Sequence, residues 1–456
     1  MPRSVRPTTA VVLLALCGLV ASLAGCSSDG GSSGSPSTTA VELARPYAIG
    51  HLTETYVDRS RSTPGGQGRA ELPERTLLTS IYYPAAGTPG GEVVEGAEPA
   101  EVGAPFPLVV LAHGLGGNEE YLTPLAQEWV AAGYVVALPH FPLTYAGTPG
   151  GIDGADVQNQ PGDVSVVVDE VLAASAGSEG PLAGLVDPDA VALAGHSNGG
   201  ITTFGAIANS CCRDERIRAA LVLSGTPSPY VGGTYDFSDI PPLMVVHGVD
   251  DQLIAYDQAV DAFHQASPPK AFLSLGQSEH GDWLVPTDEA FAVTVRATTD
   301  FLDGYLRGDS AALERLPSDQ DPPVATIYVA LEDGSSVTVP TVPAPVTDRK
   351  ATVSADTDLR EGDVVTVTWS GFLPGKTVNV LQCTGDGRGG SASCGIAEGH
   401  VLVPDPSGSG TIELVIHTGP FANGVCDAAN PCTILVNDAG LLDEDAFVYF
   451  PITFAA

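Results

Sequence analysis

Short apolar runs alternate with longer amphipathic stretches from residue 47 to residue 308. Uninterrupted apolar runs of this length are typical of strands buried on both faces of a sheet. They cover residues 106–112, 134–139, 191–195, 218–224 and 243–248. Between and after them, helical patterns cover residues 122–132, 163–176, 258–266 and 287–306. This alternation predicts a mostly parallel sheet with helices on both faces.

The pattern changes after residue 310. Residues 311–350 are rich in Pro and lack a long helical pattern, which indicates a linker with at most one short strand, at 325–331. Beyond the linker, short segments of alternating apolar and polar residues are separated by Gly, Pro and Asp. Such segments predict a small all-β sandwich. We therefore predict an α/β domain at 46–310 and a β-sandwich at 351–456.

The N-terminus has the composition of a targeting segment. Arg3 and Arg6 precede an apolar stretch at 10–23, and Leu-Ala-Gly-Cys ends at Cys26. This arrangement resembles the lipobox of bacterial lipoproteins. The resemblance implies a signal peptide at 1–25, lipidation of Cys26, a membrane anchor, and a location on the extracytoplasmic face of the bacterial membrane, with shedding or secretion as a variant.

Two other interpretations of the N-terminus are an ordinary secretory peptide and a membrane-spanning helix. The apolar stretch is too short and too often interrupted to cross a membrane comfortably. Residues 26–45 are rich in Ser and Gly near their start, which predicts a flexible tether.

Charge and cysteine content indicate which partners the chain can bind and in which compartment it lies. The chain has 55 acidic against 19 basic residues and a formal net charge of −36, which disfavours a nucleic-acid partner because phosphates would be repelled. Of the eight cysteines, Cys17 lies in the signal segment and Cys26 in the lipobox, leaving an even number of six. An even number agrees with export to an oxidising compartment.

The simplest cysteine pairing is local. It joins Cys383 to Cys394 and Cys426 to Cys432. A zinc site is disfavoured because these cysteines lack CxxC spacing, so no metal is predicted. The adjacent pair, Cys211 and Cys212, is left open between a vicinal bridge and buried thiols.

The strongest chemical signal is the pentapeptide from Gly195 to Gly199, which has the form GxSxG. It follows an apolar run and precedes a run of small and apolar residues, so Ser197 occupies a sharp turn between a strand and a helix. Side chains two residues either side of the serine would collide with the neighbouring strand and helix. In this setting GxSxG predicts a nucleophile elbow, with the Ser197 hydroxyl exposed.

A serine nucleophile needs a base and an acid, which follow it in the chain in this architecture. His280 lies in a loop after the last predicted strand, whereas His264 lies within a predicted helix, so His280 is the candidate base. Asp250 and Asp251 both follow the strand at 243–248. Turn formation would explain Asp250.

The oxyanion hole needs two backbone N–H groups. Asn198, directly after the nucleophile, supplies one. The Gly-rich loop from His113 to Gly117 supplies the other, for which Leu115 is preferred and Gly116 is the alternative. His113 and two further histidines, His196 and His247, are predicted to be structural.

Four motifs carry a family resemblance. HGLGGN at His113, GHSNGG at Gly195, HGVDD at His247 and the late His280 occur in the order of the α/β-hydrolase serine esterases. The chain resembles platelet-activating factor acetylhydrolase-like, chlorophyllase-like and dienelactone-hydrolase-like enzymes. The resemblance to their HGxxD loop favours Asp251 over Asp250 as the acid. It implies ester hydrolysis through an acyl-enzyme, without a cofactor.

The C-terminal segment resembles the neocarzinostatin-like fold, an immunoglobulin-like β-sandwich. The matching features are Leu-Arg-Glu-Gly at 359–362, Gly-Phe-Leu-Pro-Gly at 371–375, the Gln382-Cys383 pair and the spacing of the four cysteines. Two short-loop disulfides staple that fold, and some members bind a small chromophore. For this chain, a spacer or binding-module role is preferred.

The sequence thus predicts an exported, lipid-anchored serine hydrolase that acts on short-chain, lipid-derived or polymeric carboxylic esters. Two alternatives stay open. The hydrolase fold could be a catalytically idle scaffold that serves a binding or adhesion module, or it could transfer the acyl group to an alcohol. The oligomeric state is not predicted.

Overall fold

The computed structural model describes residues 43–66, 69–341, 348–372, 376–387, 394, 400–405, 407–421, 424–437 and 447–455. The predicted signal peptide, with Cys17, and the predicted lipidation site, Cys26, lie outside the described residues. Within the described ranges, none of the helices has the length and apolar character needed to span a membrane.

A ten-stranded sheet forms the centre of the α/β domain, which we define as residues 43–341. Its strands are β1 (Ala48–Asp58), β2 (Arg75–Ala85), β3 (Val94–Glu95), β4 (Phe106–Ala112), β5 (Val135–Pro139), β6 (Val186–His196), β7 (Ile217–Leu223), β8 (Leu243–Gly248), β9 (Lys270–Leu275) and β10 (Ala325–Ala330). Their order across the sheet is β10-β9-β8-β7-β6-β4-β5-β2-β1-β3.

The strands from β5 to β9 are parallel, and β2 joins them antiparallel to β5. Across the sheet from β1 to β9, neighbouring strands therefore lie in the order β1-β2-β5-β4-β6-β7-β8-β9. This is the strand order of an α/β-hydrolase. The predicted fold class is confirmed.

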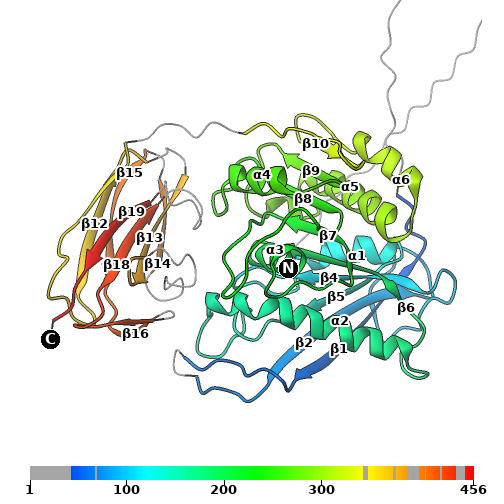
Figure 1. Ribbon diagram of the computed structural model, residues 1–456, viewed down its shortest axis with the longest axis horizontal. Helices are drawn as coiled ribbons and strands as arrows, with labels where there is room; N and C mark the ends of the chain where they lie inside the picture. The colour runs from blue at the N-terminus through cyan, green and yellow to red at the C-terminus, as the bar shows by residue number, and fades with distance from the viewer. Residues whose placement is uncertain are drawn as a thin grey trace, which may run out of the picture. The chain divides into compact units, whose positions relative to one another are not determined.

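Helices cover both faces of this sheet (Figure 1). On one face lie α2 (Gln160–Ala176), α3 (Asn198–Ala208) and α4 (Tyr256–Gln265), and on the other lie α1 (Thr123–Ala131) and α5 (Glu289–Leu306). Along β4, Leu108 and Val110 enter the first core, whereas Val109 and Leu111 enter the second. Since successive side chains alternate between two buried faces, the central strands are apolar throughout, as their sequence predicts.

The prediction that residues 311–350 form a linker is wrong for most of that segment. Helix α6 (Ser310–Arg315) is tied to α5 by an ion pair between Arg315 and Asp300 at 2.6 Å. Strand β10 lies where the sequence predicts the one short strand of this segment, at 325–331, but it pairs antiparallel with β9 along its whole length and extends the main sheet. Val339 is buried in the core under α4, and its N–H donates to Nε2 of His264 at 3.2 Å.

The start of α2 is fastened by a buried group of charges. The Arg75 guanidinium, which has no exposed surface, donates to the carboxylates of Asp156 and Asp163 at 2.6–2.9 Å. Arg61 donates to Asp163 and to the carbonyl of Asn159. Asp163 therefore lies in the first turn of α2, but its carboxylate binds these arginines and does not cap the helix.

In the β-sandwich domain, residues 348–455, the named strands pair antiparallel, and an isolated parallel bridge joins Leu359 to Phe454. One sheet contains β11 (Lys350–Val353), β12 (Val364–Ser370) and β15 (Ser409–Val415). The other contains β14 (His400–Asp405), β13 (Lys376–Thr384), β18 (Cys432–Asn437) and β19 (Phe447–Ile452). A short ribbon pairs β16 (Gly419–Phe421) with β17 (Gly424–Cys426). Buried residues of both sheets, among them Trp369, Val380 and Ile434, share one core, as the sequence pattern predicts.

Three disulfides occur in the described residues. Cys383 is joined to Cys394 and Cys426 to Cys432, which are the pairs that the spacing suggests. The adjacent cysteines, Cys211 and Cys212, form a vicinal bridge and are not buried thiols.

Candidate active site

Ser197 stands at the carboxyl end of β6, in the middle of the parallel part of the sheet. Its backbone has φ 56° and ψ −116°, a region that L-residues rarely adopt. The Ser197 N–H donates to the carbonyl of Leu223 on β7 at 2.9 Å, and α3 begins at the next residue. The predicted strand, turn and helix are present.

The two outer glycines of GxSxG are required by close contacts. A Cβ on Gly195 would lie 2.1 Å from the carbonyl oxygen of Gly199, and a Cβ on Gly199 would lie 2.2 Å from that of Ala112 on β4. Any side chain at either position would push α3 away from the sheet. The collision expected from the sequence is therefore present in the structure.

His280 and Asp251 are brought together from loops that follow β9 and β8. Nδ1 of His280 lies 2.8 Å from Oδ2 of Asp251, whose side chain is fully buried. Oδ1 of Asp251 accepts the N–H groups of Leu253 at 2.8 Å and Ile254 at 2.9 Å. Asp250, by contrast, is exposed, and its N–H donates to the carbonyl of Ser278.

His247 lies beneath this pair. Its Nε2 is 3.2 Å from Oδ2 of Asp251 and 2.9 Å from the carbonyl of Ile254, and its side chain has no exposed surface. Burial alone would raise the pKa of Asp251, but the hydrogen bonds from His247 and His280 outweigh burial and hold the pKa well below its usual range. Asp251 is therefore ionised at neutral pH.

His280 lies against His196, the residue that precedes the serine in the chain. Nε2 of His196 donates to the carbonyl of His280 at 2.8 Å, and their ring centroids lie 4.8 Å apart. Nε2 of His280 is buried and has no hydrogen-bond partner among the described residues, the Ser197 hydroxyl included. In structures without substrate this bond is commonly long and shortens when substrate binds.

The Gly-rich loop after β4 lies against the serine. A Cβ on Gly114 would be 3.1 Å from Cβ of Ser197. Within residues 114–117, the N–H of Gly114 donates to the Tyr121 hydroxyl at 2.6 Å, that of Gly116 to the Thr144 carbonyl at 2.7 Å, and that of Gly117 to the Gly114 carbonyl at 2.9 Å.

These bonds leave one donor of the loop available. No acceptor among the described residues is bonded to the N–H of Leu115. The N–H of Asn198 is likewise available because the first N–H groups of a helix have no partner within it. The geometry thus favours Leu115 over Gly116, whose N–H is already bonded.

The sequence did not identify Tyr121 as part of this loop. Its hydroxyl holds Gly114, its ring contacts His196 edge-on at 5.4 Å, and burial raises its pKa well above the usual range. It therefore acts as a neutral acceptor for Gly114. A tyrosine eight residues after His113 carries no signal of this contact until the loop folds back.

His113 is a neutral structural residue. Its Nδ1–H donates to the Gly114 carbonyl at 2.7 Å, and its Nε2 accepts the Phe141 N–H at 3.2 Å. Burial lowers the pKa of His113 to about 4, and burial also lowers the pKa of His196 to about 3. Protonation of Nε2 would break the bond from Phe141.

This arrangement predicts that the protein loses stability as the pH falls. A histidine whose folded pKa is depressed contributes its full stability above its unfolded pKa of about 6.5, and that stability is lost as the pH falls towards the folded value. Between pH 7 and about pH 4.5, His113→Gln should lose about 2 to 3 kcal/mol less unfolding free energy than the wild type. Urea unfolding at both pH values measures the difference, and equal losses would contradict the assignment.

Two loops beside α3 are joined to each other. Gln158 donates to the carbonyl of Pro229 at 3.0 Å and accepts the N–H of Val231 at 2.9 Å. Tyr230 packs with Val157 and with Ile201 of α3 in a small apolar cluster. Residues 141–159 and 226–240 thus form one support beside α3.

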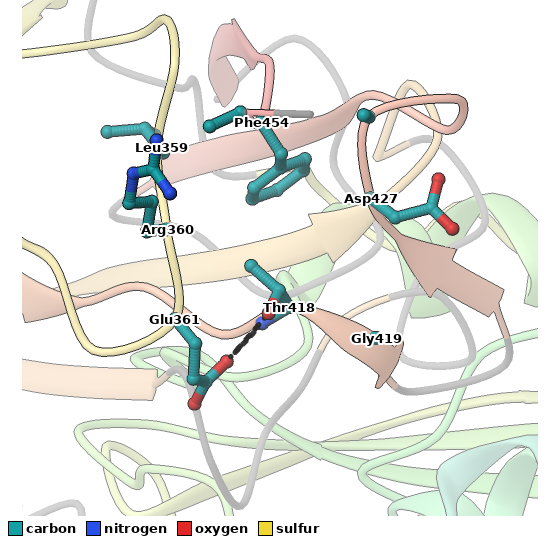
Figure 2. Close-up of a pocket in the computed structure, with 9 residues that line it drawn as sticks. Leu359, Arg360, Glu361, Thr418, Gly419, Asp427 and Phe454 are labelled. Carbon is teal, nitrogen blue, oxygen red and sulfur yellow. Dashed lines mark hydrogen bonds between the residues drawn. The ribbon is translucent and has the colours of Figure 1, made fainter.

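A separate hollow of about 230 Å³ lies in the β-sandwich domain. Figure 2 shows Glu361 pointing towards Thr418, whose N–H donates to the Glu361 carboxylate at 2.5 Å. Leu359 and Phe454 are buried at its wall. The Thr418 hydroxyl also donates to the Glu361 carboxylate, at 3.1 Å, so this carboxylate is held by the domain's own residues.

No group of three or more His, Cys, Asp or Glu side chains in the described ranges is arranged to hold a metal ion.

Comparisons with known proteins address the two domains. A family model described as the Neocarzinostatin family matches residues 351–451. Among solved structures, the chain is similar to a ferulic acid esterase from Streptomyces cinnamoneus, with 22% identity, coverage of 60% of this chain and 93% of that chain, and a TM-score of 0.44. No curated protein matches the chain. The chain therefore joins an α/β-hydrolase domain, identified by its strand order, to a C-terminal domain of the Neocarzinostatin family.

Proposed function

We propose that the α/β domain is a serine hydrolase that cleaves carboxylic esters through an acyl-enzyme. The observation that carries this proposal is the hydrogen bond between His280 and buried Asp251, next to a serine on a strained turn. The chemistry of such a site is nucleophilic attack by the serine with the histidine as base.

In the proposed reaction, the Ser197 oxygen attacks the ester carbonyl while Nε2 of His280 takes the hydroxyl proton. The Asp251 carboxylate stabilises the imidazolium that forms, and the N–H groups of Leu115 and Asn198 donate to the oxyanion. His280 then gives the proton to the leaving alcohol, and water releases the acyl group by the same steps.

The substrate class follows from the groups that would contact the reacting ester. The triad and the two backbone donors act on the carbonyl alone, so the acyl and alcohol groups are selected by the joined loops at 141–159 and 226–240. We propose short-chain or lipid-derived esters first and polyesters second. The β-sandwich domain is proposed to be a spacer or a binding module.

The proposed location rests on the N-terminal sequence. Lipidation of Cys26 would anchor the enzyme to the outer face of the bacterial membrane, and the three disulfides support export. Cys26→Ala should move the protein from the membrane fraction to the soluble fraction. A variant that stays in the membrane would contradict the lipid anchor.

The enzymatic proposal is tested by covalent labelling. A fluorophosphonate should add to the purified protein once, on the peptide that contains Ser197, and hydrolysis of p-nitrophenyl acetate should fall in proportion to labelling. An idle scaffold would be neither labelled nor active. Label on another residue, or hydrolysis that continues after complete labelling, would contradict the proposal. Adding an alcohol acceptor and analysing the products separates hydrolysis from acyl transfer.

A further inference from the structure

Gln160, the first residue of α2, occupies a position between the two sides of the proposed oxyanion hole. It has no exposed surface, although glutamine is a residue that proteins usually leave in water. A buried amide must have its polar atoms bonded, and the partners of Gln160 show where it acts.

One end of the Gln160 side chain binds the nucleophile helix. Its Oε1 accepts from Nδ2 of Asn198 at 3.2 Å and from the hydroxyl of Thr202. Asn198 is the residue whose backbone N–H is the first proposed oxyanion donor, and both of these partners are buried. Gln160 therefore fixes the first turn of α3 directly.

The other end binds the loop after β5. Its Nε2 donates to the Thr144 hydroxyl at 2.6 Å, and the Thr144 carbonyl accepts the Gly116 N–H at 2.7 Å. Gly116 follows Leu115, the second proposed oxyanion donor. Gln160 is thus connected through one residue to the loop that carries the second donor.

Gln160 is itself held in place. The preceding carbonyl, that of Asn159, accepts from Arg61 at 2.9 Å. Asp163, in the same turn of α2, is held by the buried Arg75. These anchors fix the start of α2 to β2 and to the loop after β1, so the position of the Gln160 side chain is fixed.

We infer that Gln160 is a positioning residue that sets the distance between the N–H groups of Asn198 and Leu115, and so the fit of the oxyanion hole to the transition state. This inference rests on the proposed hydrolase function. The oxyanion forms only during the reaction, so loss of the hydrogen bonds of Gln160 lowers kcat and leaves KM almost unchanged.

The test compares Gln160→Met, which keeps length but removes both polar groups, with the wild type. We expect kcat to fall about 10- to 100-fold with KM within about twofold, because complete loss of one donor costs about 10²- to 10³-fold. The inhibition constant of a trifluoromethyl ketone, whose adduct carries the same oxyanion, should rise by the same factor. The pH dependence of kcat should keep its position because His280 is untouched.

Thr144→Val supplies an independent variant. It keeps the carbonyl that holds Gly116 but removes the hydroxyl that Gln160 binds, so it should lower kcat in the same direction, and Thr144→Ser should restore it. If Gln160 acts through Thr144, the double variant should lose little more than Gln160→Met alone. Losses that multiply would overturn the connection through Thr144.

Thr298→Val is the matched control. It also removes buried hydrogen bonds, in which the Thr298 hydroxyl accepts from Nε1 of Trp129 at 3.1 Å and donates to the Thr294 carbonyl at 2.7 Å, on the other face of the sheet. It should lower the melting temperature without lowering kcat. If Gln160→Met lowers only the melting temperature, as this control does, the role of Gln160 is structural and the inference is wrong. If the wild type itself does not hydrolyse esters, the proposed function has failed instead.

Discussion

Replacing Ser197 by alanine is expected to lower kcat for p-nitrophenyl acetate by about 10⁶-fold, while the protein stays folded. The hydroxyl oxygen forms the acyl-enzyme in the proposed reaction, and no other group can take its place at the end of β6. The residual rate should still exceed that of the uncatalysed reaction by about 10³-fold, because the N–H groups of Leu115 and Asn198 still bind the oxyanion. Steady-state kinetics with active-site titration of the wild type measures both values.

The same position offers a control for folding. Ser197 adopts φ 56°, which costs an L-residue about 1 to 3 kcal/mol but costs glycine little. Ser197→Gly should therefore be as inactive as Ser197→Ala and yet more stable than it in urea. Hydrolysis retained by either variant would contradict Ser197 as the nucleophile, whereas a less stable glycine variant would contradict only the strain.

Most of the α/β domain could be predicted because its strands are buried on both faces. Each central strand is apolar throughout, so its limits are visible in the sequence. For β10 the sequence indicates only a short strand inside a linker, because β10 lies at the edge of the sheet, where Ile327 is buried but Tyr328 and Val329 are partly exposed. Its flanking prolines are typical of a linker, and only its pairing with β9 shows that it belongs to the sheet.

The candidate site divides in the same way. Ser197, His280 and Asp251 follow strands and have a fixed order in the chain, so spacing identifies them. Gln160 and Tyr121 have no such spacing, because they bind the site by hydrogen bonds that form only when α2 and the Gly-rich loop pack against α3. Asp163 illustrates the same limit. Its place at the start of a predicted helix indicates a helix-start role, whereas its partners, Arg61 and the buried Arg75, lie about a hundred residues earlier in the chain.

The second large effect is expected from Asp251→Asn, which should lower kcat by about 10⁴-fold. The hydrogen bonds of Asp251 give the reason. Oδ1 accepts two backbone N–H groups, those of Leu253 and Ile254, so the oxygen of an asparagine must occupy that side. Its NH₂ group then faces His280, which can bond to it only by accepting at Nδ1. The proton moves to Nε2, and the imidazole can no longer take a proton from Ser197.

Asp250→Asn is the matched control, since it makes the same change one residue away on an exposed side chain. It should keep kcat within about twofold of the wild type. Both variants lose one negative charge, so a long-range effect of charge would lower the two rates equally. A larger loss in Asp250→Asn would make Asp250 the acid and would contradict the bond between Asp251 and His280. Loss in Asp251→Asn alone shows that the position of one carboxylate decides which nitrogen of His280 is free to accept the proton of the serine.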